Sequence, residues 1–369
     1  MLNPRVDRLF AALQTSTDFQ ALVLNPGPTL FYLTGLNFHL MERPVVTIFT
    51  AARSCVMILP ELEVSRAQKA ALPVQFFPYN DNPATWGDAF KRAAAALAAD
   101  GLTLGVEPTR LRFLEMRFLE EALPKSRFTS AHGLLSGLRI AKDAGEIAAM
   151  RKAVDIAQRG LEATLALTRA GMTEREVASE LVLQLLRAGS DAELPFGPIV
   201  ASGPNAADPH ATPGERRLQN GDLLIVDWGA AADGYVSDLT RTFAIGEVEP
   251  ELKKIVEIVR QANEAGRLAG KPGLPAGAVD QATRKVIDDA GYGVYFNHRT
   301  GHGLGLEGHE EPYMFGENKL LLTEGMTYTV EPGIYFVGRG GCRIEDNVVV
   351  TASGAETLSS MPRELRQIG

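Results

Sequence analysis

Short apolar runs and helical patterns alternate along the first third of the chain. The apolar runs ALVLN, PVVTIFT, SCVMILP, VQFFPY and LTLGVE have the length of buried strands. The segments TWGDAFKRAAAALAAD and LRFLEMRFLEEAL carry apolar residues at helical spacing. Because strands alternating with helices are typical of an α/β domain, we expect such a domain from about residue 18 to about residue 130.

The pattern changes near Leu138. The segment TSAHGLLSGLRIAKDAGE is rich in small residues, and it is followed by EIAAMRKAVDIAQRGLEATLAL, which predicts a long amphipathic helix. We therefore place a domain boundary here, with a smaller N-terminal α/β domain at 1–137 and a larger domain at 138–369.

Three further helices are predicted in the larger domain from their end signals. Thr173 and Glu176 form a capping box that begins one helix, and Gly189 ends that helix. Another helix is expected from Pro250 to Gly270, and one from about Ala278 to Ala290. Strand pairs lie between and after these helices, so the fold class predicted for the larger domain is α+β.

Composition narrows the range of partners. The net charge of -8 and the absence of a Lys/Arg run argue against nucleic acid or an anionic membrane as the main partner. The first residues lack the apolar stretch of a signal peptide, and no segment approaches the roughly 18 apolar residues of a membrane span. Cys55 and Cys342, which are far apart, fit a reducing compartment and do not resemble catalytic thiols. We expect a soluble cytoplasmic protein.

Two aspartates lie in what the sequence predicts to be one β-hairpin. The runs DLLIVDWGA and YVSDLTRTF flank Asp233–Gly234, a strong signal for a two-residue turn. With this turn, Asp227 lies opposite Thr240, and the carboxylates of Asp227 and Asp238 share one face of the hairpin. A four-residue loop preserves this arrangement, whereas a bulged three-residue loop breaks it.

The ordinary explanation of an isolated aspartate is a turn or a solvated surface position. Asp227 follows Leu223, Leu224, Ile225 and Val226, and so lies in a strand that the pattern predicts to be buried. A charge persists in such a place only when it is paired or bound to a metal.

Two glutamates lie in a second candidate hairpin. TYTVEPGIYF carries Glu331, and GCRIEDNVVVT carries Glu345 in a comparable place. Two hairpins with two carboxylates each indicate a duplicated scaffold with its site on a pseudo-symmetry axis, although the halves share no sequence identity. The alternative is that backbone groups satisfy Glu331 at the Pro-Gly turn and that Glu345 pairs with Arg343.

Four histidines gather in the larger domain: His210, His298, His302 and His309. Gly301, Gly303 and Gly305 flank His302 and allow backbone to approach a bound group closely. One imidazole among four carboxylates suits Mn²⁺, Fe²⁺, Co²⁺ or Zn²⁺ better than Ca²⁺. The alternative for each histidine is a core or rim position, hydrogen-bonded to a neighbouring carbonyl.

Six motifs, taken in order, carry a family resemblance: SGPNAADPH, VDWGA, SDLTRTF, TGHGLGLEGHEEP, VEPG and RIEDN. They resemble the metallopeptidases that include methionine aminopeptidase, Xaa-Pro aminopeptidase and Xaa-Pro dipeptidase (prolidase), over roughly residues 140 to 360. The resemblance implies a C-terminal pita-bread fold. The preceding α/β domain resembles that of the creatinase, prolidase and aminopeptidase P branch, which points to cleavage of Xaa-Pro bonds.

The resemblance also implies a dinuclear metal site. Asp227 would chelate one ion, Asp238 and Glu345 would bridge, and His302 with Glu331 would complete the second. The ions would be two divalent metals, Mn²⁺ first, with Co²⁺ or Zn²⁺ as alternatives. Two cations roughly 3.5 to 4 Å apart generate a bridging hydroxide that can hydrolyse the peptide bond without a protein nucleophile.

Further roles follow from the same resemblance. Glu331 would pass the proton of the attacking water to the leaving proline nitrogen, and His210 and His309 would hydrogen-bond the substrate carbonyl or the tetrahedral intermediate. His298 and Arg343 match positions near the specificity pocket and the outer shell of the site.

One position departs from the pattern of archaeal prolidases. These commonly carry Arg just after their HExP segment, where it grips the dipeptide carboxylate, but here HEEP is followed by Tyr313. Another cation would then be needed. Arg343 is one candidate, and Arg43 in the loop FHLMERP is another, with Glu42 available for the substrate α-amine. That loop either reaches an active site and limits substrate length, or is an ordinary solvated loop.

These expectations favour an Xaa-Pro dipeptidase that acts on proline-containing dipeptides or short peptides as a homodimer. The modest chain length and compact N-terminal domain favour it over aminopeptidase P, which acts on longer peptides. Two further classes of function occur on related folds, namely a creatinase-like hydrolase and a non-enzymatic binding module. The intact set of five ligands argues against both, because buried carboxylates without cations are unfavourable.

Overall fold

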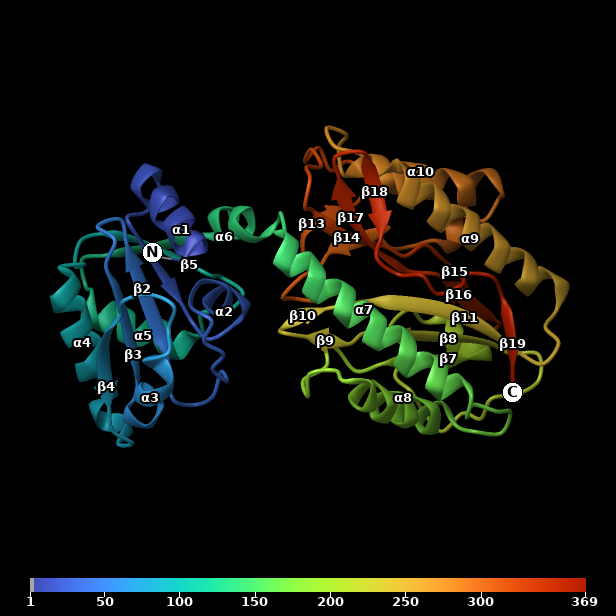
Figure 1. Ribbon diagram of the computed structural model, residues 1–369, viewed down its shortest axis with the longest axis horizontal. Coiled ribbons are helices and arrows are strands. Elements are labelled where there is room, and N and C mark those ends of the chain that lie inside the picture. The colour runs from blue at the N-terminus through green and yellow to red at the C-terminus, as the bar shows by residue number, and fades with distance from the viewer. Residues whose placement is uncertain (1–2) are drawn as a thin grey trace. The chain divides into compact units, whose positions relative to one another are not determined.

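The computed structural model describes residues 3–369 and divides into two compact units, Met1–Arg139 and Ile140–Gly369 (Figure 1). The observed division follows Arg139, whereas the sequence pattern placed it after residue 137. Within the described range, no helix is both long enough and apolar enough to cross a bilayer.

Unit 1 is built on a six-stranded mixed sheet with the strand order β4-β3-β2-β1-β5-β6. β1 pairs antiparallel with β2 and parallel with β5. The five apolar runs seen in the sequence form the first five strands, and the sixth is a short polar edge strand. The bounds are β1 Ala21–Leu24, β2 Val46–Thr50, β3 Cys55–Pro60, β4 Gln75–Tyr79, β5 Thr103–Val106 and β6 Arg127–Ser130.

Helices cover both faces of this sheet. α4 buries Phe90 against one face, in a cluster with Val46 and Ile48 of β2. α1 covers the other face, where Phe10 meets Phe49 edge-on with ring centroids 6.2 Å apart. The expected α/β unit is confirmed. Its helices are α1 Pro4–Thr15, α2 Pro28–Thr34, α3 Val64–Ala67, α4 Trp86–Leu97, α5 Phe113–Ala122 and α6 His132–Arg139.

Unit 2 contains the four longer helices that the sequence predicted. The capping box of Thr173 and Glu176 is present at the start of α8, and Gly189 ends that helix in the left-handed conformation. A second capping box, Asp143 with Glu146, begins α7. The bounds are α7 Ala144–Leu165, α8 Glu174–Ala188, α9 Pro250–Ala269 and α10 Gly277–Asp289.

The strands of unit 2 form two main layers, antiparallel except for the parallel pair of β11 with β19. Helices α7 and α8 lie along one side, and α9 and α10 along the other (Figure 1). One layer has the order β19-β11-β8-β7, the other β13-β12-β14-β17-β18, and two short pairs complete them. The bounds are β7 Ile199–Ser202, β8 Leu223–Trp228, β9 Ala231–Ala232, β10 Tyr235–Val236, β11 Leu239–Ile245, β12 Gly301–Gly303, β13 Glu310–Met314, β14 Thr327–Val330, β15 Gly333–Phe336, β16 Gly340–Arg343, β17 Asp346–Thr351, β18 Gly354–Thr357 and β19 Arg366–Ile368.

The first hairpin has the predicted turn and register. Asp233 and Gly234 have φ angles of 54° and 82°, as a type I′ turn requires. Asp227 lies opposite Thr240, as predicted. The ladder is interrupted between β8 and β9, where a Cβ on Gly229 would lie 2.2 Å from the Ser237 carbonyl oxygen. This interruption places Asp238 just before β11.

The second hairpin is present, but it is not the continuous pair that was expected. β14 pairs with β17 up to Val330 and Asp346, whereas β15 pairs with β16 from Gly333 and Arg343. Glu331 and Glu345 lie opposite each other in the gap between the two ladders. A bridge between Thr240 and Glu345 joins this gap to the first hairpin. Because the ladder is interrupted there, Glu331 and Glu345 need not follow the regular alternation of side chains between the two faces of a sheet.

The layer of β8 is supported from outside by the close packing of α7 on α8. Trp228 of β8 is fully buried, and its indole N–H donates to the Ala157 carbonyl of α7 at 2.8 Å. The two helices approach at Gly160, where a Cβ would lie 2.7 Å from Leu185 Cδ2 and 3.2 Å from the Leu185 Cα.

We predict that Gly160→Ala destabilises the protein, although Ala is the better helix former by about 1 kcal/mol. The added methyl meets backbone as well as side chain, so overpacking should lower the free energy of unfolding by about 1–3 kcal/mol. Urea unfolding measures this. Gly137→Ala in α6 is the matched control, because its Cβ would meet nothing within 4 Å, and it should be neutral or stabilising. Equal effects of the two substitutions would contradict the packing argument.

Candidate metal centre

The interruptions of the two hairpins bring together the side chains that the sequence singled out as metal ligands. Ligand atoms of Asp227, Asp238 and Glu345 lie within 4.8 Å of one another, and so do those of His302, Glu331 and Glu345. Glu345 belongs to both groups, so the five side chains form one continuous cluster. Asp227, Asp238, His302 and Glu345 are buried, and Glu331 is partly exposed.

A third group extends this cluster toward the surface. Asp238, His302 and His309 also bring their ligand atoms within 4.8 Å of one another. The rings of His302 and His309 lie 3.7 Å apart between centroids, at an interplanar angle of 32°. His309 is exposed, so it connects the buried carboxylates to solvent.

A backbone carbonyl sets the protonation of the His302 ring. Nδ1 lies 3.1 Å from the Gly303 carbonyl oxygen, which can only accept, so Nδ1 carries the hydrogen. Nε2 faces the carboxylates, at 3.3 Å from Glu331 Oε1 and 3.7 Å from Asp238 Oδ2. Metal-binding histidines are commonly oriented by such a second hydrogen bond, so the ring is placed as a metal ligand would be.

Burial and the close approach of the carboxylates oppose the ionisation of several of them. Burial raises the pKa of Asp238 and of Glu345 well above the usual range, and the neighbouring carboxylates raise both further. Burial opposes ionisation of Glu331 too, but the hydrogen bond from His302 and its charge lower the pKa of Glu331 to about 2. A divalent cation would remove the repulsion and stabilise all of the ionised forms.

The donor set has a buried ligand atom that no protein group in the described part of the chain uses. Asp227 Oδ1 is buried, and no hydrogen-bond donor reaches it from anywhere in residues 3–369. Buried carboxylate oxygens rarely lack a partner, because the loss of solvation is then uncompensated. Oxygen atoms from four carboxylates and one imidazole nitrogen are ligands that divalent transition metals accept. The side chains present therefore fit a metal site.

Arg343 occupies the other side of Asp227. Its Nη2 lies 2.6 Å from Asp227 Oδ2, and both side chains are buried. The alternative in which Arg343 pairs with Glu345 is wrong, because Glu345 Oε2 instead accepts a hydrogen bond of 2.7 Å from the Thr240 hydroxyl. The sequence did not single out Thr240 beyond its position opposite Asp227.

A chain of hydrogen bonds runs from Arg343 to His298. Arg343 Nη1 donates to the Tyr335 hydroxyl at 2.9 Å, and His298 Nε2 lies 2.9 Å from the same hydroxyl. His298 Nδ1 lies 2.8 Å from the Arg299 carbonyl and must donate to it. Nε2 therefore accepts from Tyr335, and burial lowers the pKa of His298, which favours this neutral form. Both ring nitrogens of His298 are thus engaged by protein groups.

Tyr335 was missed in the sequence. Its only signal was its position in GIYF, directly after the VEPG motif.

His210 and Tyr313 lie at the rim of the centre. His210 is exposed, and the preceding Pro209 carbonyl accepts a long hydrogen bond of 3.4 Å from Arg343, which ties the loop to the buried cluster. Tyr313 is partly buried and stacks beneath Arg299, whose Cζ lies 4.4 Å from the ring centroid.

Glu42 and Arg43 belong to unit 1. Arg43 lies 3.0 Å from Asp81 and 3.3 Å from Glu42 between charged atoms. Its positive charge is therefore already balanced by carboxylates of its own unit.

Family comparisons agree with both units. Residues 148–352 match the model of metallopeptidase family M24, and residues 5–141 match the creatinase/prolidase N-terminal domain. The chain belongs to metallopeptidase family M24. This confirms the expected α+β pita-bread fold with a creatinase-type N-terminal domain, and it makes the protein a peptidase that uses divalent metal ions.

Individual M24 relatives are similar along the whole chain. An Xaa-Pro dipeptidase from Pyrococcus horikoshii is 33% identical over 372 residues, covering 99% of each chain. The crystal structure of a dipeptidase from Pyrococcus horikoshii OT3 superposes with a TM-score of 0.92 at 38% identity, over 99% of this chain and 100% of that one. A prolidase structure from Thermococcus sibiricus gives a TM-score of 0.93 at 34% identity over 100% of both chains.

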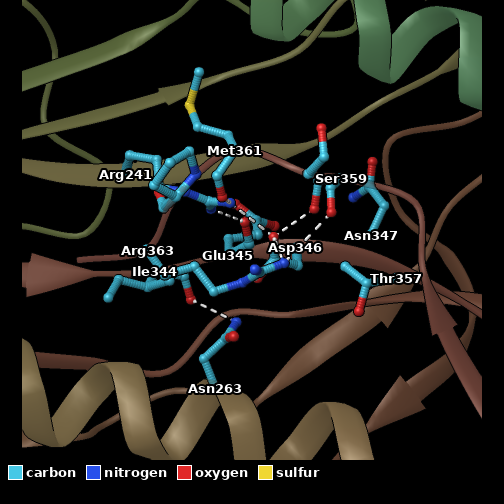
Figure 2. A network of polar contacts seen from close by, with 12 residues as sticks. Arg241, Asn263, Ile344, Glu345, Asp346, Asn347, Thr357, Ser359, Met361 and Arg363 are labelled. Carbon is cyan, nitrogen blue, oxygen red and sulfur yellow. Dashed lines mark hydrogen bonds and ion pairs between the residues drawn. The ribbon is translucent and has the colours of Figure 1, made fainter.

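A buried ion-pair network holds the backbone of Glu345, one member of the carboxylate cluster (Figure 2). The fully buried Asp346 lies 2.8 Å from Arg241 and 2.6 Å from Arg363, and it also accepts a hydrogen bond from Ser359. Arg241 Nη1 donates to the Glu345 carbonyl at 2.7 Å. The network therefore fixes the strand position from which the Glu345 carboxylate enters the site.

The same network ties the last segment of the chain to the centre. Arg241 donates to the carbonyls of Met361 and Pro362, at 2.9 Å in each case. Although burial opposes it, the guanidinium groups of Arg241 and Arg363 hold the pKa of Asp346 well below its usual range.

We predict that Asp346→Asn lowers the free energy of unfolding by about 3–5 kcal/mol at pH 7, because the change leaves buried guanidinium groups uncompensated. The pKa of Asp346 is lower in the folded protein than in the unfolded chain, so its ionised carboxylate stabilises the fold at pH values above the unfolded pKa of about 4. This contribution to the free energy of unfolding is lost as the pH falls below that value. The free energies of unfolding of wild type and Asp346→Asn, measured with urea, should therefore become more similar as the pH is lowered from 5 to 3.

The control for this substitution is Asp289→Asn, whose exposed pair with Lys285 at 2.8 Å should contribute at most about 0.5 kcal/mol. Equal unfolding midpoints of wild type and Asp346→Asn at pH 7, or a gap that widens toward pH 3, would contradict the role given to the network.

Proposed function

We propose that this chain is an Xaa-Pro dipeptidase, which hydrolyses the peptide bond before proline in dipeptides. The observation that carries the proposal is the convergence of four carboxylates and one imidazole on one buried point of the M24 unit. The M24 relatives named Xaa-Pro dipeptidase and prolidase, which are similar along the whole chain, support this substrate class.

The proposed ligands fall into two sets that share two members. Asp227 would bind one ion, His302 and Glu331 the other, and Asp238 and Glu345 both. When bound, a pair of divalent cations lowers the pKa of water and polarises the scissile carbonyl. We propose Mn²⁺ as the first candidate, with Co²⁺ and Zn²⁺ as alternatives, because these ions accept mixed oxygen and nitrogen ligands.

Glu331 is the proposed proton carrier of the reaction. Its side chain is 17% exposed, against 7% for Asp238 and 4% for His302, so it is the member of the cluster most open to water and substrate. Its low pKa keeps it ionised, and an ionised carboxylate can take a proton from the attacking water. It would then deliver that proton to the proline nitrogen, which leaves as an amine.

His309 and His210 are the proposed hydrogen-bond donors to the substrate carbonyl. Burial and the charge of His302 lower the pKa of His309 to about 4, so at neutral pH the ring carries a single N–H. His210 lies at the exposed rim, and an imidazole N–H can donate to a carbonyl oxygen. Donors placed beside the developing oxyanion stabilise the transition state more than the ground state.

His298 and Arg343 are proposed to shape the pocket and to hold Asp227 in place. Their shared contact with Tyr335 supports this role. A dedicated pocket is needed because the proline nitrogen carries no hydrogen in the peptide bond and its φ angle is fixed.

Asp238→Asn should abolish peptidase activity and metal binding together, because this side chain belongs to two of the three ligand groups. Turnover of Gly-Pro and metal content after loading with Mn²⁺ measure the two effects. Mn²⁺ should also raise the melting temperature of the wild type, but not of the variant. Asp155→Asn, at an exposed surface pair with Arg159, is the control and should leave all three readouts unchanged. Full turnover by Asp238→Asn refutes the proposed ligand set.

Substrate length separates the proposal from its nearest alternative. The wild type should cleave Gly-Pro faster than Gly-Pro-Ala, whereas preferential cleavage of the tripeptide would assign the chain as an aminopeptidase P. The loop bearing Glu42 and Arg43 is proposed to contribute to this preference. Arg43→Ala should then cleave the tripeptide relatively better, and an unchanged ratio would remove Arg43 from the proposal.

A further inference from the structure

The Arg299 guanidinium lies at the rim of the metal centre and forms no ion pair within residues 3–369. Arg299 is partly buried, and its Nη2 lies 3.4 Å from His309 Nδ1. The His309 ring in turn lies 3.7 Å from the ring of His302. Arg299 is therefore separated from the proposed ligands by the width of one imidazole. No motif in the sequence singled it out, although it lies between His298 and His302.

Charge balance distinguishes Arg299 from the two cations that the sequence had suggested for the substrate carboxylate. Arg343 is paired with Asp227 at 2.6 Å, and Arg43 lies 3.0 Å from Asp81. By contrast, no carboxylate from residues 3–369 lies within ion-pair distance of the Arg299 guanidinium, whose side-chain contacts are with Tyr313 and His309. A partly buried guanidinium without a counter-charge is unfavourable unless a ligand supplies the anion.

The backbone on both sides of Arg299 is held by side chains of α10. On one side of Arg299, Arg284 of α10 donates to the His298 carbonyl at 2.8 Å. On the other side, the Thr300 amide donates to Asp280 of α10 at 3.1 Å. The Tyr313 ring lies against the guanidinium, with Arg299 Cζ 4.4 Å from the ring centroid. A stacked guanidinium is well suited to bind a carboxylate through two hydrogen bonds.

The spacing fits the carboxylate of a dipeptide. In Xaa-Pro, the terminal carboxyl carbon follows the scissile carbonyl carbon by one residue, so the two are about 3–4 Å apart by covalent geometry. When the scissile carbonyl lies at the ligand cluster beside His309, a carboxylate at this distance also lies beside the His309 ring, on the path toward the Arg299 guanidinium that contacts the same ring.

We propose that Arg299, stacked on Tyr313, binds the C-terminal carboxylate of the substrate and so restricts the enzyme to dipeptides. It would replace the arginine that follows the HExP segment in archaeal prolidases, a position that Tyr313 occupies here. This inference rests on the proposed Xaa-Pro peptidase activity and names the group that sets its substrate length.

Arg299 also contacts His309, so an effect on the orientation of His309 has to be distinguished from binding of the substrate carboxylate. A guanidinium can only donate, so His309 Nδ1 accepts and Nε2 carries the hydrogen that would face the substrate. If orienting His309 were the whole function of Arg299, its loss would slow every Xaa-Pro substrate alike. Recognition of the carboxylate affects only substrates that have one at that position.

The experiment compares Gly-Pro with its C-terminal amide, Gly-Pro-NH₂, in the Mn²⁺-loaded wild type, Arg299→Gln and Arg299→Lys. The wild type should prefer the free acid by on the order of 10- to 100-fold in kcat/KM, as hydrogen bonds to a charged group allow. Arg299→Gln should lose this preference, mainly through a higher KM for Gly-Pro, so that kcat/KM falls far more for the acid than for the amide. Arg299→Lys should recover part of the preference, and Arg187→Ala, an exposed control in α8, should change neither substrate.

Two results would overturn the inference while leaving the peptidase assignment intact. One is an equal loss on acid and amide in Arg299→Gln, and the other is an unchanged preference for the acid. A wild type that binds Mn²⁺ but cleaves neither compound would instead refute the proposed function. A second experiment uses the wild type alone and so does not depend on the folding of the Arg299 variants. L-proline should inhibit Gly-Pro cleavage more strongly than L-prolinamide, because only L-proline carries the carboxylate. Equal inhibition by the two compounds would overturn the inference.

Discussion

The repulsion among four carboxylates that face one another in a buried space is the constraint on which the rest of this protein depends. Asp227, Asp238, Glu331 and Glu345 come from two hairpins, and burial together with mutual repulsion raises the pKa of Asp238 and Glu345. Such a cluster is unfavourable by itself, so the surrounding fold must hold it in place. The interrupted ladders, the Arg343 pair and the ion pairs around Asp346 all serve this end.

The predictable parts of the fold were those determined by local chemistry. The turn at Asp233–Gly234 fixed the register that places Asp227 opposite Thr240, and the capping box at Thr173 fixed the start of α8. Both depend on residues that are neighbours in the sequence. The convergence of the five proposed ligands was predicted from the family resemblance. It was also predicted from the loop length of the first hairpin, which places Asp227 and Asp238 on the same face.

The unpredicted parts were those that depend on contacts between distant segments. The second hairpin is interrupted at Glu331 and Glu345 because the bridge to Thr240 competes with continuous pairing. Arg343 pairs with Asp227, which is 116 positions away, and not with its near neighbour Glu345. Likewise, the contact of Tyr335 with His298 has no signature in either motif. Each depends on how segments that are distant in the sequence lie against each other, which no local pattern encodes.

The position of the Arg241 network along the chain has a consequence for synthesis. Residues from Ser359 to Arg363 supply a hydroxyl, two carbonyls and a guanidinium to the network that holds Glu345. A growing polypeptide on the ribosome cannot complete this network until residues 359–363 have left the exit tunnel. During synthesis, the strand position of Glu345 is therefore fixed later than the two hairpins that precede this segment.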